Sequence, residues 1–344
     1  MKKAIILFSI LCLLLSMLCA CGSSDASAAS VASAAEATQA SQASDTAAAD
    51  DTASAAEAAV PAVVTATATA GDVEMDYCCF GTGSRIFVIL PGLSIQPVTP
   101  SAEAIAQGFA DFATDFTVYL FDRRSNLPET YTIEEMAEDT AAVMESLGLS
   151  HVSIFGASQG GMMAQVIALN HPELVDNLVL GSTLSRTNDT MKAVCGEWLE
   201  LAKAGKGYEL NEALCRAIYS EATMEAYSDA LLAAGDSITD EDLSRFIVLA
   251  SSLEDFDIYD RLGELQCNVL VLGCEGDQVT TLEGAQEIAD ALITGREGEQ
   301  SSSEEIGSTY LCECYIYGPE YGHAVFDEAP DYRGRILEFL QNAE

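Results

Sequence analysis

Basic residues are scarce in this sequence. Its 344 residues include 15 Lys and Arg against 54 Asp and Glu, which gives a formal net charge of −39 at pH 7. A chain this acidic repels phosphate backbones, so the composition argues against nucleic acid as a partner. It also disfavours anionic substrates and anionic lipid surfaces, and otherwise indicates only a well-solvated surface.

Histidine is also scarce, which narrows the choice of a general base. The chain has three histidines, His151, His171 and His323. It lacks a metal-binding motif, a Gly-rich phosphate loop and an internal repeat. We therefore expect no metal, no cofactor and no repeat architecture.

The segment that indicates chemistry most directly is GASQGG, residues 156–161. An apolar run that predicts a buried strand precedes it, at 152–155, and an Ala/Met/Ile-rich run that predicts a helix follows it, at 162–170. Strand, G-x-S-x-G and helix form the context of a nucleophile elbow, in which small residues permit the tight turn that exposes the serine hydroxyl. Ser158 is therefore the candidate nucleophile. The alternative is a chance match in a chain rich in Gly, Ala and Ser.

A serine hydroxyl needs a base that takes its proton and an acid that orients the base. In elbow enzymes the chain order is Ser, then Asp or Glu, then His, and only His323 follows a plausible acid. His151 begins the elbow's own strand, so we expect it at the opposite end of the sheet. His171 ends the next helix, where a cation near the helix C-terminus is the simpler interpretation.

The candidate acid is expected at the C-terminal end of another strand. Residues 268–273 predict that strand, and the loop after it contains Asp277, with Glu275 as its competitor. Either carboxylate has an alternative role as a solvated loop charge or a helix N-cap. The spacing favours Asp277.

An oxyanion hole requires two N–H donors. One is expected from the backbone of Gln159, directly after the nucleophile. The other is expected from the backbone of Leu93, because an apolar strand at 86–90 is followed by Pro91 and Gly92, and a glycine permits the necessary turn.

Taken together, residues from about 72 to 344 resemble an α/β-hydrolase of the serine-hydrolase type. The matching blocks are the turn at 90–93, the loop at 121–126, the elbow, and the loops of Asp277 and His323. The resemblance implies a mostly parallel sheet with helices on both faces, and an inserted helical cap at about 184–262 that sets substrate choice. One departure is that the family usually has His-Gly at the oxyanion turn, where this chain has Pro91-Gly92.

The first 20 residues predict an export signal, with Lys2 and Lys3 before an apolar stretch. Leu18-Cys19-Ala20-Cys21 resembles a bacterial lipobox. That resemblance implies cleavage before Cys21, thioether- and amide-linked acyl chains (palmitate among them) on Cys21, and a lipid-anchored protein on the extracytoplasmic face of the cell membrane. An uncleaved signal anchor is the alternative. Residues 21–71 have no aromatic side chain and predict a disordered tether rich in Ala, Ser and Thr.

Export permits disulfide bonds, but most cysteines of the chain's main body lie in apolar, strand-like contexts where a buried thiol is the commoner state. The sequence leaves this choice open. A second insertion, at 295–308, is acidic and rich in Ser and Gly, and predicts a solvated loop. The cysteines outside the leader and the proposed anchor are Cys78, Cys79, Cys195, Cys215, Cys267, Cys274, Cys312 and Cys314.

The sequence therefore leads to the hypothesis of a lipid-anchored serine hydrolase that cleaves an ester or thioester in a small-molecule acyl substrate. In this hypothesis Ser158 attacks, His323 transfers the proton and Asp277 orients the imidazole. A peptidase, a C–C hydrolase and an acyltransferase are alternatives on the same site. A non-catalytic or solute-binding lipoprotein is a separate alternative, and the sequence does not indicate an oligomeric state.

Overall fold

The computed structural model describes residues 62–300, with the backbone alone for 294–300, and residues 310–343. The export signal, Cys21 and most of the predicted tether lie outside the described residues. Among the helices of the described part, none is long and apolar enough to cross a membrane.

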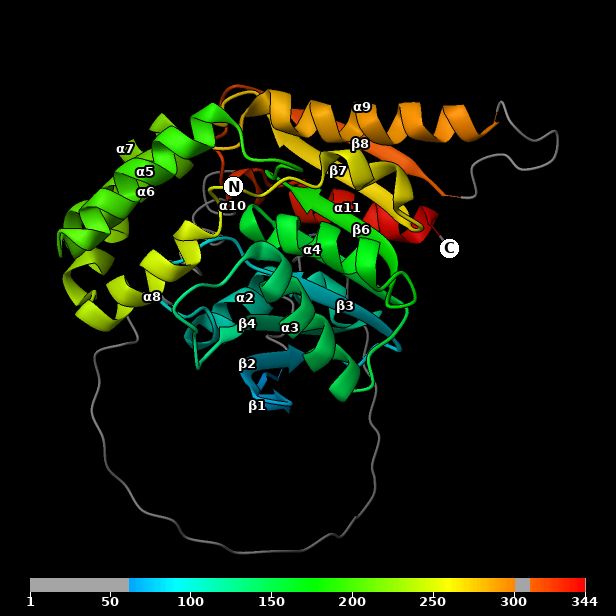
Figure 1. Ribbon diagram of the computed structural model, residues 1–344, viewed down its shortest axis with the longest axis horizontal. Helices are drawn as coiled ribbons and strands as arrows, with labels where there is room; N and C mark the ends of the chain where they lie inside the picture. The colour runs from blue at the N-terminus through cyan, green and yellow to red at the C-terminus, as the bar shows by residue number, and fades with distance from the viewer. Residues whose placement is uncertain (1–61, 301–309, 344) are drawn as a thin grey trace, which may run out of the picture.

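An eight-stranded sheet runs through the described part in the order β1-β2-β4-β3-β5-β6-β7-β8 (Figure 1). The β1–β2 and β2–β4 pairs are antiparallel, and all later neighbours pair in parallel. The expected mostly parallel sheet is confirmed. The strands are β1 Val64–Ala70, β2 Val73–Phe80, β3 Arg85–Leu90, β4 Phe116–Arg124, β5 Val152–Ala157, β6 Val175–Gly181, β7 Asn268–Cys274 and β8 Cys312–Tyr317.

The sheet begins earlier than the sequence suggested, which corrects the predicted end of the tether at residue 71. Residues 64–70, VTATATA, form strand β1 and pair with β2 across a turn in which Gly71 has a φ of 62°. The composition of this segment resembles the tether, but Val and Thr alternate with Ala. β-Branched residues favour extended backbone, so the segment completes a hairpin at the sheet edge.

Helices cover both faces of the sheet, as expected for buried parallel strands. Along β3, Val88 and Leu90 join the core on one face, and Phe87 and Ile89 join the core on the other. The first face is covered by α3, α4 and α9, and Figure 1 shows α3 and α4 in front of the sheet. The second is covered by α2 and α11. These helices are α2 Ala102–Gly108, α3 Ile133–Ser146, α4 Gln159–Asn170, α9 Thr281–Gln300 and α11 Tyr332–Asn342, with a short α10 at Val325–Glu328.

The prediction of a loop at 295–308 is wrong for residues 295–300, because α9 continues to Gln300. A Ser/Gly-rich composition indicated a loop, but the helix already formed at Thr281 extends through it. Residues 301–309 lie outside the described residues.

Four α-helices are inserted between β6 and β7, and Figure 1 shows them grouped at one side of the molecule. The last of them begins with a capping box, in which Thr239 and Asp242 satisfy each other's backbone N–H groups. We refer to this insertion as the cap. Its helices are α5 Asp189–Lys203, α6 Gly207–Ile218, α7 Glu221–Ala233 and α8 Asp240–Ser251, and short 3-10 turns flank them at Ala234–Ser237 and Tyr259–Glu264.

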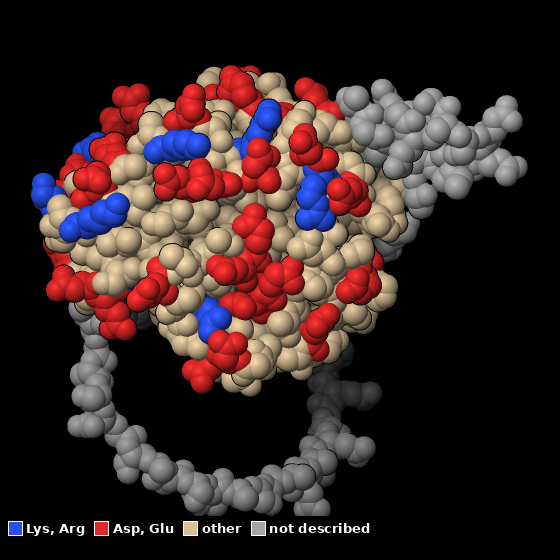
Figure 2. Space-filling model, in the orientation of Figure 1, with Lys and Arg blue, Asp and Glu red and all other residues tan. Residues whose placement is uncertain are grey.

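The surface reflects the acidic composition. Figure 2 shows carboxylates spread over the face it presents, with few Lys and Arg side chains among them. This distribution gives no basic stripe on that face of the kind that nucleic-acid binding uses.

Candidate active site

Ser158 lies at the sharp turn between β5 and α4. Its backbone has a φ of 52° and a ψ of −120°, in a region that serine rarely adopts. Two hydrogen bonds tie this turn to the end of β6: Ser158 N donates to Gly181 O at 2.9 Å, and Thr183 Oγ1 donates to Ser158 O at 2.6 Å. The strain is thus held by surrounding structure, as in a nucleophile elbow.

The turn after β3 packs directly on the elbow. A Cβ atom at Gly160 would overlap the carbonyl oxygen of Leu90, so only glycine allows this approach. A Cβ at Gly92 would lie 3.2 Å from Ser158 Cβ and 3.9 Å from Ser158 Oγ. The structure therefore brings the Pro91-Gly92-Leu93 turn beside the candidate nucleophile.

His323 and Asp277 form a buried pair. His323 Nδ1 lies 2.9 Å from Asp277 Oδ2 and 3.1 Å from Asp277 Oδ1, and the two side chains are 6% and 1% exposed. The two residues come from the loops that follow β8 and β7, which are adjacent parallel strands. Parallel pairing places both loops at the carboxyl edge of the sheet, where the elbow also lies.

Asp277 is held in place by its own loop. Val279 N and Thr280 N donate to its Oδ1 at 2.8 and 2.9 Å, and Thr280 Oγ1 donates to Oδ2 at 2.5 Å. Burial alone would raise the pKa of Asp277. The charge and hydrogen bond of His323, together with the Thr280 and Val279 donors, outweigh burial and hold this pKa below its usual range.

The other sequence candidates lie elsewhere. Glu275 is exposed on the same loop as Asp277. His151 lies at the opposite edge of the sheet, where its Nδ1 is 3.0 Å from Asp176 Oδ1. His171 follows the last residue of α4, as expected, and its Nε2 is 2.9 Å from Glu138 Oε2.

The two predicted oxyanion donors are on neighbouring segments. Gln159 is the first residue of α4, where a helical N–H has no acceptor within the helix. Within the described part of the chain, neither the Gln159 N–H nor the Leu93 N–H donates a hydrogen bond. Both groups are therefore available to an oxygen bound beside Ser158.

Sequence reasoning missed Arg123, which supports the turn that lacks the usual histidine. Arg123 lies near the end of β4 and is 5% exposed. Its Nη2 donates to Pro91 O at 2.8 Å and to Gln159 Oε1 at 2.9 Å. The only signal in the sequence was its place in the block at 121–126, which was expected to be a loop, whereas β4 continues through it to Arg124.

Sequence reasoning also missed Glu328, which holds the loop of His323 against the cap. Its Oε2 accepts from Gly322 N at 2.6 Å, and its Oε1 accepts from Ser220 N, at the start of α7, at 2.8 Å. Ala324 N donates to Ile218 O at 2.8 Å. The segment on both sides of His323 is therefore anchored to the cap.

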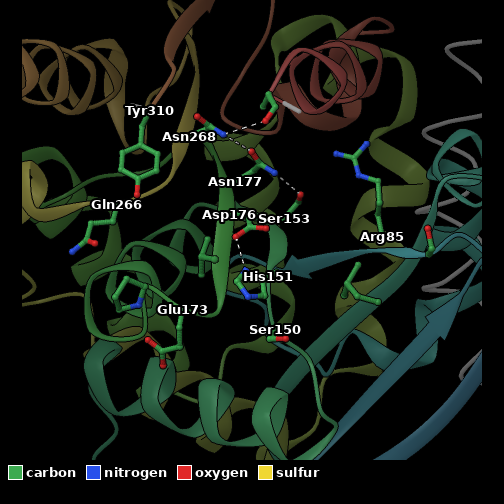
Figure 3. Close-up of a pocket in the computed structure, with 15 residues that line it drawn as sticks. Arg85, Ser150, His151, Ser153, Glu173, Asp176, Asn177, Gln266, Asn268 and Tyr310 are labelled. Atoms are coloured by element: carbon green, nitrogen blue, oxygen red, sulfur yellow. Dashed lines mark hydrogen bonds and ion pairs between the residues drawn. The ribbon is translucent and has the colours of Figure 1, made fainter. Parts of the chain in front are cut away.

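A cavity of about 900 Å³, drawn in Figure 3, is lined by residues at the start of β5 and β6, so it lies at the opposite edge of the sheet from Ser158. Its lining includes His151 and Asp176. Its amide side chains are hydrogen-bonded: the buried Asn177 donates to Ser153 Oγ at 3.1 Å, and the partly buried Asn268 donates to Asn177 Oδ1 at 2.9 Å. This groove contains a histidine–carboxylate pair but no strained serine turn.

Five of the described cysteines are buried. Burial raises the pKa of Cys78 to about 12 and that of Cys195 to about 11, so these thiols are protonated at neutral pH. The described residues include one cluster with the spacing of a metal site, Glu145, His171 and Glu173. It lies on the surface, away from Ser158, and exposed groups of this kind are common without a metal.

Comparisons with known proteins bear on the fold. A family model described as alpha/beta hydrolase fold matches residues 87–209. The provisionally named carbamate hydrolase RutD of Caulobacter sp. strain K31 is 25% identical over 193 residues, which cover 52% of this chain and 69% of RutD. The 3-oxoadipate enol-lactonase 2 of Acinetobacter baylyi is 20% identical over 235 residues, which cover 66% of this chain and 85% of that enzyme.

Solved structures show the same fold. The α/β hydrolase MGS-M2, from a Medee basin deep-sea metagenome library, superposes with a TM-score of 0.68 at 23% identity, and the match covers 80% of this chain and 97% of MGS-M2. The chain has the α/β-hydrolase fold, and its relatives' names support a hydrolase.

Proposed function

We propose that this protein is a serine hydrolase that cleaves an ester or thioester bond through an acyl-enzyme intermediate. The observation that carries the proposal is the buried His323–Asp277 pair, at 2.9 Å, on the sheet edge that also bears the strained Ser158 turn. A nucleophile, a base and an orienting acid on three loops of one edge are what acyl transfer needs.

In the first half of the reaction, Ser158 Oγ attacks the acyl carbon while His323 Nε2 accepts the hydroxyl proton. Asp277 holds Nδ1 protonated and stabilises the imidazolium. The carbonyl oxygen becomes an oxyanion that accepts from the N–H groups of Leu93 and Gln159. The C–O or C–S bond then breaks, and the leaving group departs with the proton from His323.

In the second half, water attacks the acyl-enzyme carbon and gives its proton to His323. The tetrahedral intermediate forms in the same oxyanion hole. Ser158 Oγ leaves and recovers the proton, and the carboxylic acid is released. No metal or cofactor takes part in this scheme.

The names of the relatives favour an ester among the possible substrates. An enol-lactone is a cyclic ester, and a carbamate is an ester whose acyl carbon also carries a nitrogen. Both substrates are taken from the names of the relatives. A net charge of −39 disfavours anionic acyl groups. Peptidase, C–C hydrolase and acyltransferase activities need the same site, and hydrolysis rates measured with water against added alcohol separate the transferase from the others.

The test is labelling with a fluorophosphonate probe, followed by hydrolysis of chromogenic esters of increasing chain length. Ser158→Ala is expected to abolish labelling and to lower kcat at least roughly a thousandfold. Ser153→Ala is a matched control, because this buried serine lies five residues earlier in the same strand, at the opposite end of the sheet. Labelling that persists in Ser158→Ala and disappears in Ser153→Ala would reject the proposed site.

We also propose that the enzyme is anchored to the extracytoplasmic face of the cell membrane through acyl chains on Cys21. The support is the lipobox-like Leu18-Cys19-Ala20-Cys21. Cys21→Ala should release the protein from membranes or leave the leader uncut. A variant that partitions and migrates like wild type would contradict the anchor and leave the proposed chemistry unaffected.

A further inference from the structure

Arg123 connects the two segments that carry the predicted oxyanion donors. A single nitrogen, Nη2, donates to Pro91 O, two residues before Leu93, and to the side chain of Gln159. Pro91 is 32 residues and Gln159 is 36 residues from Arg123 in the sequence. One guanidinium nitrogen thus sets the spacing between the turn after β3 and the start of α4.

The acceptor side of this bridge is itself fixed. Gln159 is fully buried, and its Nε2 donates to Leu249 O at 2.8 Å and to Ser252 Oγ at 3.1 Å. These two acceptors lie at the C-terminal end of cap helix α8. The bridge therefore links three parts of the fold: the oxyanion turn, the elbow and the cap.

Arg123 is held without an ion pair among the described residues. The neighbouring Asp122 carboxylate instead accepts from Val98 N at 2.7 Å, from Thr99 N at 3.0 Å and from Arg245 Nη2 at 3.0 Å. Arg123 Nε is buried and has no hydrogen-bond partner in the described part of the chain. The Asp122 charge stabilises the Arg123 cation through space, but the side-chain hydrogen bonds of Arg123 go to the oxyanion turn and to the elbow.

The charge of Arg123 strengthens these two hydrogen bonds. Burial and the nearby Arg245 lower the pKa of Arg123 to about 10, so the guanidinium remains charged at neutral pH. A charged donor in a poorly solvated region makes stronger hydrogen bonds than a neutral donor, here to Pro91 O and Gln159 Oε1.

We propose that Arg123 is a positioning residue that holds the Leu93 and Gln159 N–H groups in register for the oxyanion, in place of the histidine that this turn lacks. The proposal rests on the proposed function. Arg123 acts through Pro91 and Gln159 rather than on the substrate. Its loss should therefore affect the transition state more than substrate binding.

The experiment compares Arg123→Met, Arg123→Lys and Arg124→Met in the full chain. Arg124 is the matched control, because it is the next residue of β4 and pairs with Asp72 and Asp139 instead. A chromogenic ester gives kcat and KM, a fluorophosphonate gives the labelling rate, and urea unfolding gives stability. Arg123→Met should lower kcat and the labelling rate about 100-fold with KM changed less than about threefold, because misplaced groups cost rates of this order.

Arg123→Lys keeps a cationic donor and should recover kcat to within about tenfold of wild type, whereas Arg124→Met should keep the wild-type kcat. The proposal is overturned if Arg123→Met has the same kcat as Arg124→Met. It is also overturned if the decrease in kcat is no larger than the decrease in the fraction of folded protein. Should Arg123→Met not fold, Gln159→Met removes the bridge from its acceptor side and keeps the backbone N–H. A wild-type kcat in that variant also overturns the proposal.

The outcome for wild type separates this inference from the proposed function. If wild type is not labelled at Ser158, the proposed function fails and the inference fails with it. If wild type is labelled and Arg123→Met is labelled at the same rate, the inference alone fails.

Discussion

The sheet carries a histidine–aspartate pair at each of its two ends. At the carboxyl edge, His323 Nδ1 lies 2.9 Å from Asp277. At the opposite edge, His151 Nδ1 lies 3.0 Å from Asp176. The residue types are the same and the distances differ by only 0.1 Å, so any difference in what the two pairs do must come from their surroundings.

Burial is the first difference. The His323 and Asp277 side chains are 6% and 1% exposed, whereas those of His151 and Asp176 are 71% and 52% exposed. Water around the exposed His151–Asp176 pair, which we call the outer pair, screens its charges and competes for its hydrogen bond. The Asp277 carboxylate is instead held by Thr280 and by two backbone N–H groups.

The second difference is what lies beside each pair. The carboxyl edge has the strained Ser158 turn, and Gly92 packs on it. In the groove of Figure 3, the nearby Ser153 hydroxyl accepts a hydrogen bond from the Asn177 side chain. A short histidine–carboxylate distance is therefore found at both ends of the sheet, and the carboxyl edge combines it with burial and a strained serine turn.

The largest expected effect separates the two histidines. His323→Ala removes the only base within the proposed site and should lower kcat by about 10⁶-fold, as loss of a triad histidine does in serine hydrolysis. His151→Ala should leave kcat within about twofold, because a change to an exposed side chain far from the chemistry perturbs little. Steady-state ester hydrolysis measures both. An inactive His151→Ala variant that is still folded would move the active site to the groove.

The next largest expected effect on kcat distinguishes Asp277 from the exposed carboxylates of Asp176 and Glu275. Asp277→Asn replaces an acceptor with an amide that favours the wrong imidazole tautomer, and kcat should fall about 10⁴-fold. Asp176→Asn and Glu275→Gln should each change kcat only a few-fold, since both carboxylates are exposed. Near-UV circular dichroism checks that each variant is folded. A severe loss in Glu275→Gln with a mild effect in Asp277→Asn would reverse the assignment of the acid.

The candidate residues that the sequence proposed share one property: each lies in the turn or loop that follows a strand. Ser158, Asp277 and His323 follow β5, β7 and β8, and parallel strands bring such positions to one edge. Chain order then excluded His151, which precedes the elbow. Apolar runs and strand-end loops are local signals, so they can be read without the tertiary structure.

The residues that the sequence did not locate act through contacts that are distant in the chain. Arg123 reaches Pro91 and Gln159, and Glu328 reaches Ser220 across 108 residues. No local pattern encodes such contacts. Strand β1 was missed for a different reason, because an Ala-rich composition outweighed the alternation of Val and Thr within it.

The third prediction concerns the contribution of Asp277 to the free energy of unfolding and how that contribution changes with pH. Removing the Asp277 carboxylate leaves the buried donors of His323, Thr280 and Val279 without their acceptor, so Asp277→Ala should lower the free energy of unfolding by roughly 1–3 kcal/mol at neutral pH. The folded state depresses the pKa of Asp277 below its unfolded value, so this stabilisation is fully present above about pH 4. It is lost as the pH falls further, towards the depressed folded pKa.

Urea unfolding at pH 7 and at pH 3 measures this contribution. The difference in stability between the two pH values should be smaller in Asp277→Ala than in wild type, because the variant lacks the carboxylate that takes up a proton. Asp176→Ala should follow the wild-type profile closely. Equal acid sensitivity in wild type and Asp277→Ala would contradict the inferred direction of the pKa shift.

The smallest effect concerns the outer pair itself. A double-mutant cycle over His151→Ala and Asp176→Ala, measured by urea unfolding, isolates the energy of their interaction from the other contacts of each residue. For an exposed pair we expect about 0.2–1 kcal/mol at low ionic strength, decreasing in 0.5 M salt because the charges are screened. A coupling of several kcal/mol that resists salt would show that the groove shelters its pair as the carboxyl edge does, and the contrast between the two ends of the sheet would no longer rest on burial.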